Sequence, residues 1–186
     1  MVKNDPHVKE ARQHMQKTID VFKEELGGIR AGRVSPTLIE KVEVKAYGQT
    51  MELRQLALIS VQGSNTLVVQ PFDQSTVDAI FKALEKEDLG TMPVSDGRVI
   101  RINFPPLSEE RRKEMIKLVH KFAEEAKIAI RNIRRDIIKK IDSKQKNGEY
   151  SEDQARRVKD EIQKVTDEFI KKIDEMVEHK EKEIME

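Results

Sequence analysis

Residues 105–154 read PPLSEERRKEMIKLVHKFAEEAKIAIRNIRRDIIKKIDSKQKNGEYSEDQ, and this stretch predicts two long helices joined by a short turn. Ser108 is suited to cap the first helix, because its hydroxyl can accept a backbone N–H and Glu109 and Glu110 follow at the positive helix end. Apolar residues recur every three or four positions over residues 115–141. This spacing places one apolar stripe along about seven turns of helix.

The turn after this helix determines how the two helices run. Asn147-Gly148 ends the first helix, and residues 151–154 have the pattern of a capping box that opens the second. Because only residues 147–150 separate them, the two helices are predicted to be antiparallel. The second helix also carries a single apolar stripe, which consists of Val158, Ile162, Val165, Phe169, Ile173, Met176 and Val177.

A third helix must complete the core, because each of these helices has only one apolar face. The N-terminal segment is suited to supply it. Asp5-Pro6 is a helix start, the apolar spacing continues to about Arg30, and Gly32 is expected to end the helix. The sequence therefore predicts an elongated antiparallel three-helix bundle formed by residues 1–30 and 106–186.

Residues 31–105 follow a two-residue period, which is typical of strands. Alternating or continuous apolar runs predict strands over residues 42–46, 56–61, 66–69 and 100–104. Between the third and fourth runs, Ser75 is suited to cap a short helix that Leu89-Gly90 ends. The fold class is therefore α+β, with a small α+β domain inserted between the first and second helices of the bundle.

The chain crosses between these two domains twice, near residues 31–33 and at residues 105–106. Two crossings permit one domain to rotate against the other but prevent independent tumbling. Glycine, arginine and proline at these places suit a hinge. The candidate hinge residues are Arg30, Gly32, Arg33, Pro105 and Pro106.

The composition excludes several classes of protein. The absence of Cys excludes disulfides, iron–sulfur clusters, thiolate zinc sites and a cysteine nucleophile. The four histidines lack metal-ligand spacing, and the sequence has no phosphate-binding glycine loop or nucleophile elbow. No uncharged apolar run is long enough to span a membrane, and the N-terminus lacks signal or transit character. We therefore expect a cytoplasmic, non-enzymatic protein with no catalytic residue, metal or cofactor.

Charge is unevenly distributed, although the formal net charge is +1. Residues 111–146 hold 13 basic and 5 acidic side chains, a net +8, whereas residues 151–186 hold 8 basic and 12 acidic ones, a net −4. On a helical wheel at about 100° per residue, four cations of the first long helix lie on one side, beside its apolar stripe. We call this set the basic stripe, and it consists of Lys127, Arg131, Arg134 and Arg135.

Two interpretations of the basic stripe remain open. The stripe can pair with acidic side chains of the next helix, as the flanks of coiled coils do. It can equally bind the phosphates of a structured RNA, because guanidinium groups bind phosphate oxygens in a bidentate manner. The low aromatic content, 4%, favours structured RNA, since a single-strand binder needs stacking platforms. The alternative function is a helical scaffold or chaperone-like module that binds proteins.

Several segments of the chain resemble the ribosome recycling factor family. They are residues 29–36, 47–48, 55–57, 88–90, 96–97, 100–101, 105–112, 130–136 and 163–167. The matches keep the family's order over the whole chain. The most specific are the Arg-Asn-x-Arg-Arg core at 131–135 and the Arg-x-Gly-Arg hinge at 30–33.

This resemblance implies an L-shaped molecule with the outline of tRNA. It also implies binding to the bacterial ribosome after termination and, with elongation factor G and GTP, separation of the subunits from mRNA and tRNA. The helical domain is then expected to lie on large-subunit rRNA, with Arg134 as the central contact, and we expect the protein to act as a monomer. The candidate rRNA-binding residues are Arg111, Arg112, Lys127, Arg131, Arg134 and Arg135.

Overall fold

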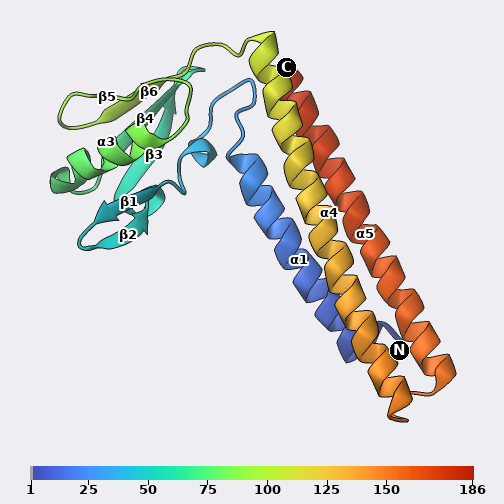
Figure 1. Ribbon diagram of the computed structural model, residues 1–186. Helices are drawn as coiled ribbons and strands as arrows, with labels where there is room; N and C mark the ends of the chain where they lie inside the picture. The colour runs from blue at the N-terminus through green and yellow to red at the C-terminus, as the bar shows by residue number, and fades with distance from the viewer. Residues whose placement is uncertain (1) are drawn as a thin grey trace. The chain divides into compact units, whose positions relative to one another are not determined.

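The structure is a computed structural model that describes residues 2–186 and divides into two compact units. The helical unit contains the residues up to Leu26 together with Ile116–Lys182, and the strand unit contains Gly27–Met115 together with Glu183–Glu186. Long helices and a small antiparallel β domain therefore occur in one chain, as the predicted α+β class requires (Figure 1).

The helical unit is formed by three helices of the described chain, and Figure 1 shows them lying side by side. They are α1 (Pro6–Gly27), most of α4 (Glu109–Lys146) and most of α5 (Glu152–Met185). Their fully buried side chains include Met15 and Phe22 of α1 and Ile130 and Ile137 of α4. Long as these helices are, none within residues 2–186 is apolar enough to cross a membrane.

Side-chain caps position the starts of the helices. Ser108 and Ser151 each accept, through Oγ, the backbone N–H three residues later at 3.1 Å. The Asp5 carboxylate accepts the backbone N–H of His7 at 2.9 Å at the start of α1. Gly148, with φ +78°, occupies the left-handed conformation that follows the end of α4 and that glycine adopts readily. The predicted helix starts and the antiparallel turn are confirmed.

The predicted end of the first helix, at about Arg30, was wrong, because α1 ends at Gly27. Two consecutive glycines explain the earlier end, since each disfavours helix by about 1 kcal/mol relative to alanine. Ile29 and Arg30 are nevertheless buried, with 4% and 8% of their surface exposed. The apolar spacing thus identified buried positions correctly beyond the point where the helix stops.

The strand unit contains two antiparallel sheets within residues 2–186. Strands β1 (Glu43–Ala46) and β2 (Gln49–Glu52) form a hairpin. A second sheet has the order β3-β4-β6-β5, formed by β3 (Ala57–Gln62), β4 (Thr66–Pro71), β5 (Val94–Ser95) and β6 (Ile100–Asn103). Helices α2 (Leu53–Leu56) and α3 (Val77–Lys86) complete the unit, and Ile80 and Leu84 of α3 belong to the same buried core as Leu67, Ile100 and Ile102 of the sheet.

Two predicted details of the short helix were wrong. Ser75 is not its cap, because the Asp73 carboxylate accepts the Ser75 N–H at 2.9 Å and holds a 3-10 turn, Gln74–Thr76, ahead of α3. The helix also ends at Lys86, before Leu89-Gly90. Asp73 precedes the turn and can bind its own downstream backbone, which is the usual role of aspartate in turns.

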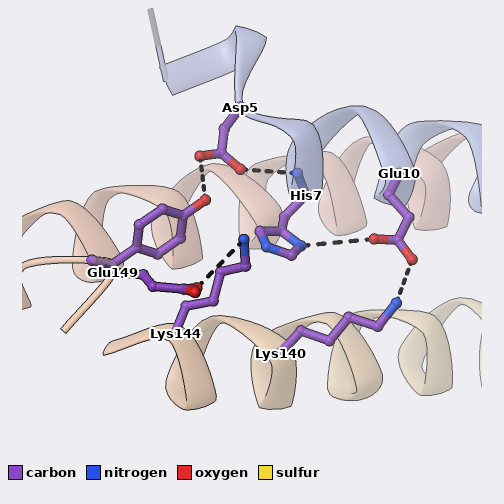
Figure 2. A network of polar contacts seen from close by, with 7 residues as sticks. Asp5, His7, Glu10, Lys140, Lys144 and Glu149 are labelled. Atoms are coloured by element: carbon purple, nitrogen blue, oxygen red, sulfur yellow. Dashed lines mark hydrogen bonds and ion pairs between the residues drawn. The ribbon is translucent and has the colours of Figure 1, made fainter. Parts of the chain in front are cut away.

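A polar network lies at the end of the helical unit where the turn joins α4 and α5, as Figure 2 shows. The Tyr150 hydroxyl donates to Asp5 Oδ2 at 2.8 Å, and Lys140 Nζ donates to Glu10 Oε1 at 2.6 Å. His7 Nδ1 lies 3.7 Å from Glu10 Oε2. Burial, followed by the hydrogen bond to Asp5, raises the pKa of Tyr150 to about 12. The network links the start of α1 to α4 and to the turn that precedes α5.

The Lys140–Glu10 contact predicts a pH-dependent contribution to stability. The hydrogen bond from Lys140 lowers the pKa of Glu10 below its usual 4.5. The contact therefore contributes its full stability above pH 4.5. The contribution is lost as the pH falls through the lowered pKa of Glu10 in the folded protein. We expect Lys140→Met to reduce the free energy of unfolding by about 0.3–1 kcal/mol at pH 7 and by a smaller amount at pH 3, below the usual pKa of the carboxyl. Thermal denaturation at both pH values measures this, with exposed Lys139→Met as the control. An equal deficit at the two pH values would contradict the prediction.

Candidate nucleic-acid interface

The basic stripe lies on α4 beside its contacts with α5, in the part of the helix that belongs to the helical unit. Lys127 and Arg134 are half-buried at the edge of the packed surface, whereas Arg131 and Arg135 are exposed. The apolar side of the same helix is buried in the core, and Ile130 and Ile137 are among its buried side chains. Helical periodicity therefore brings these four cations together as predicted.

The interface between α4 and α5 contains a regular column of polar contacts, which we call the α4–α5 ladder. Three of its contacts are His120–Glu181 at 2.5 Å, Lys127–Asp174 at 2.6 Å, and Asp142–Lys159. In each of the three contacts the two residue numbers add to 301. A constant sum is the signature of two antiparallel helices packed in one register, so the partner of any ladder position follows from its number.

Arg134 departs from this pattern. By register its partner is Asp167, yet Arg134 Nη1 donates to Gln163 Oε1 at 2.8 Å. Gln163 Nε2 in turn donates to Asp167 Oδ1 at 2.9 Å. Within residues 2–186, Arg134 Nε is buried and has no hydrogen-bond partner. A neutral amide therefore holds the guanidinium, and the carboxylate lies one step further away.

The other members of the basic stripe have different partners. Lys127 pairs with Asp174 on α5, as the pairing interpretation predicts. Arg131 Nη1 lies 3.8 Å from Glu124 Oε1 on its own helix, and half of the Arg131 side chain is exposed. Exposed pairs of this kind contribute about 0–1 kcal/mol and exchange partners readily. Pairing with α5 thus accounts for Lys127 and leaves the three arginines available to another anion.

Arg111 and Arg112 belong to the strand unit, at the start of α4, so the structure does not place them with the basic stripe. Arg111 Nη1 donates to Glu114 Oε2 at 3.0 Å. A Cβ added at Gly90 would lie 3.3 Å from Arg111 Nη2, so this side chain packs against the loop that precedes β5. Arg112 is half-buried.

Arg30 joins the two chain crossings inside the strand unit. Its Nη1 donates to the carbonyl oxygen of Pro105 at 2.5 Å, and its guanidinium carbon lies 5.4 Å from the centre of the Phe104 ring. Burial, with a smaller repulsion from Arg111, lowers the pKa of Arg30 below its usual value. The structure therefore brings together two of the candidate hinge residues, Arg30 and Pro105.

Gly32 is held by the last residues of the chain instead. Its backbone N–H donates to the carbonyl oxygen of Glu183 at 3.3 Å, and an added Cβ would lie 3.4 Å from the carbonyl carbon of Glu186. Gly32 does not adopt a positive φ, and 3.4 Å is an ordinary contact distance, so neither feature requires glycine at this position. Arg33 and Pro106 are exposed.

We expect Arg30→Met to destabilise the strand unit by about 1.5–3 kcal/mol, because it removes a buried, charge-assisted hydrogen bond to Pro105 and the cation–π contact with Phe104. Hydrogen exchange of the β4 and β6 amides measures the loss. Arg33→Met, at an exposed position three residues from Arg30, is the matched control and should stay within about 0.5 kcal/mol of the original chain. Equal protection in both variants would contradict the prediction.

Gln163 and Asp167 were not predicted as site residues, although both lie in the segment 163–167 quoted for the family resemblance. Their side chains are exposed and carry no motif of their own. The signal that could have identified them is the register of the ladder, which places Asp167 opposite Arg134 and Gln163 one turn away on the same face of α5.

Comparisons with known proteins give one consistent result. A family model described as ribosome recycling factor matches residues 22–185. The chain is 53% identical over 180 residues to a ribosome-recycling factor of Thermoanaerobacter sp. strain X514, which covers 97% of this chain and 98% of that protein. It is 49% identical over 177 residues to a ribosome-recycling factor of Halalkalibacterium halodurans, with coverage of 95% and 96%.

Solved structures give the same result. A solution structure of a ribosome recycling factor matches with a TM-score of 0.75 at 41% identity, over 95% of this chain and 94% of that one. A second match has a TM-score of 0.65 at 44% identity over 97% of each chain. It is described as models for the T. thermophilus ribosome recycling factor and the E. coli elongation factor G bound to the E. coli post-termination complex.

Proposed function

The chain belongs to the ribosome recycling factor family, and from this we propose that it binds the post-termination bacterial ribosome through the basic stripe of α4. The observation that carries the proposal is the contact of Arg134 with a neutral amide, which restrains the side chain without adding a counter-charge. The anion that it then binds is a phosphate of large-subunit rRNA. Lys127, Arg131 and Arg135 surround that contact, and Arg111 and Arg112, at the start of α4, contact rRNA at a separate place.

The charge distribution supports a phosphate partner. Residues 111–146 carry a net +8, and the exposed contacts of Arg131 are weak enough to be replaced by phosphate oxygens. Phosphate contacts of this type position a protein on RNA by shape and backbone, without reading bases. The protein-binding scaffold has weaker support, because Arg131 and Arg135 on the exposed side of α4 are cationic.

The remaining steps need a partner. In the proposed reaction the factor acts with elongation factor G and GTP, and the ribosomal subunits separate from mRNA and tRNA. The chain has no phosphate-binding glycine loop, so the partner hydrolyses the GTP and this protein acts without catalysis of its own, as a monomer in the cytoplasm. In this proposal the rRNA-binding domain consists of residues 1–30 and 106–186, and the second domain consists of residues 31–105. The hinge is formed by the crossings at Arg30–Arg33 and Pro105–Pro106.

The test is ribosome binding over a range of salt concentrations. If the three arginines of the basic stripe neutralise phosphates, the logarithm of the association constant should fall with the logarithm of salt concentration with a slope of about −2 to −3. Light scattering then measures subunit separation with and without elongation factor G and GTP. Binding that does not depend on salt would favour the protein-binding scaffold. Salt-dependent binding without subunit separation would contradict the proposed role in recycling and leave the proposed rRNA contact standing.

A further inference from the structure

The contact at Arg134 is unlike the other contacts of the α4–α5 ladder. Lys127 meets the carboxylate of Asp174 directly at 2.6 Å. Arg134 meets the amide of Gln163 at 2.8 Å, and the carboxylate at its register position accepts from that amide at 2.9 Å. One neutral group therefore stands between the cation and the anion at this position.

Asp167 determines which way the Gln163 amide faces. An ionised carboxylate only accepts hydrogen bonds, so the NH₂ group of the amide must face Asp167 and its oxygen must face Arg134. The guanidinium has five N–H hydrogens, of which one is donated to Gln163 and the buried Nε holds another. Three N–H hydrogens on Nη1 and Nη2 remain for a further acceptor.

The neutrality of the amide has an electrostatic consequence. A carboxylate in direct contact would compensate the charge of Arg134 and would compete with a phosphate for the same hydrogens. An amide restrains the side chain without adding a counter-charge. Restraint before binding also reduces the conformational entropy that the side chain loses when it meets its ligand.

We propose that Gln163, held by Asp167, is a positioning residue that orders the Arg134 guanidinium for an rRNA phosphate. This inference rests on the proposed function, since it assigns a supporting residue to the contact proposed there. It also predicts that glutamine is required at position 163, because glutamate has the same length but neutralises the cation.

Ribosome affinity of two variants of the full chain, measured at several salt concentrations, tests the inference. Gln163→Ala should weaken binding about three- to tenfold, the cost of ordering one free arginine side chain, with an unchanged salt slope because the charge of Arg134 remains. Gln163→Glu should weaken binding further and reduce the slope by about one, because the new carboxylate neutralises Arg134.

A second measurement does not involve the ribosome. Nitrogen-15 relaxation of Arg134 Nε in the free protein should show a lower order parameter in Gln163→Ala. Asp167→Asn keeps an oxygen that can accept from Gln163 and should preserve the order parameter of the original chain. A role limited to stability would lower the melting temperature and leave the mobility of Arg134 unchanged.

Helix α1 supplies a matched control. Gln16 Nε2 donates to Asp20 Oδ1 at 3.0 Å, the same spacing of four residues as in the pair on α5, and both side chains are exposed on α1. Gln16→Ala should therefore leave ribosome affinity and the Arg134 order parameter unchanged. A loss of affinity equal to that of Gln163→Ala would overturn the inference.

The outcomes separate the inference from the proposed function. If Arg134→Ala weakens binding and Gln163→Ala does not, the positioning role is wrong and the rRNA contact stands. If neither variant weakens binding, the proposed contact of Arg134 fails together with the positioning role. If Gln163→Ala lowers affinity only in proportion to a loss of folded protein, Gln163 is structural and the inference is overturned.

Discussion

Arg134→Ala is expected to weaken ribosome binding about ten- to a hundredfold while the protein stays folded. A charge-assisted hydrogen bond contributes about 1.5–3 kcal/mol, which corresponds to that range of affinity. Arg134→Lys keeps the charge but loses the planar pair of donors, so its affinity should be intermediate. The salt slope should be nearly kept in Arg134→Lys and flattened by about one in Arg134→Ala.

Melting temperature and ribosome affinity of the same preparations decide the result. Arg157→Ala removes the same charge from an exposed position on α5 and is the control for net charge. If Arg134 serves the bundle instead, Arg134→Ala should lower the melting temperature, and affinity should fall only as folding does. If Arg134→Lys bound the ribosome as tightly as the original chain, bidentate binding of a phosphate by Arg134 would be contradicted.

Phe169→Ala is expected to cost about 3–5 kcal/mol of unfolding free energy, the largest stability effect that we predict. The ring is 2% exposed in the core of the helical unit, so its loss combines a transfer cost with a cavity. Lys172 Nζ also lies 4.6 Å from the centre of this ring and loses its partner.

Urea denaturation followed by circular dichroism measures the effect. Ile128→Ala removes an apolar side chain that is 49% exposed on α4 and should cost less than about 1 kcal/mol. The position of Phe169 in the core would be contradicted if the two variants lost similar stability. Ribosome affinity per folded molecule should be unchanged in both.

Features that depend on neighbouring residues could be predicted from the sequence. The caps at Ser108 and Ser151 act within three residues, and the apolar spacing of α4 and α5 repeats over many turns. The same spacing failed at the end of α1, where the backbone cost of Gly27 and Gly28 outweighs continued burial. Periodicity reports which side chains are buried, and it does not report whether the backbone between them is helical.

The small domain shows the same limit at shorter range. Strands β1 and β6 were predicted because their alternation extends over four residues or more. Strand β5 has two residues and α2 has four, which is too few for a period to be recognised. Their conformations depend on pairing with residues distant in sequence, such as β6 with β5.

The candidate interface was predicted in position but not in its contacts. A helical wheel places Arg134 beside the core, and nothing in α4 alone indicates that Gln163 on another helix holds it. The missing quantity is the register of α4 against α5. Two residues whose numbers add to 301 are equally far along the chain from the point between Tyr150 and Ser151, which lies in the turn. The position of the turn in the sequence therefore predicts the register. The rotation of each helix about its axis is set by core packing, which the turn does not determine.

The network in which Tyr150 donates to Asp5 has a consequence for the order in which the protein is made. Asp5 and Tyr150 are 145 residues apart, and Arg12 and its partner Glu168 are 156 apart. Helix α1 is therefore synthesised first and stays without its packing partners until nearly the whole chain has been translated. All the strands lie within residues 43–103, so the sheets can form while the apolar face of α1 is still open. During that interval the nascent chain exposes an amphipathic helix, and a chaperone that binds apolar helix faces has its longest opportunity to act.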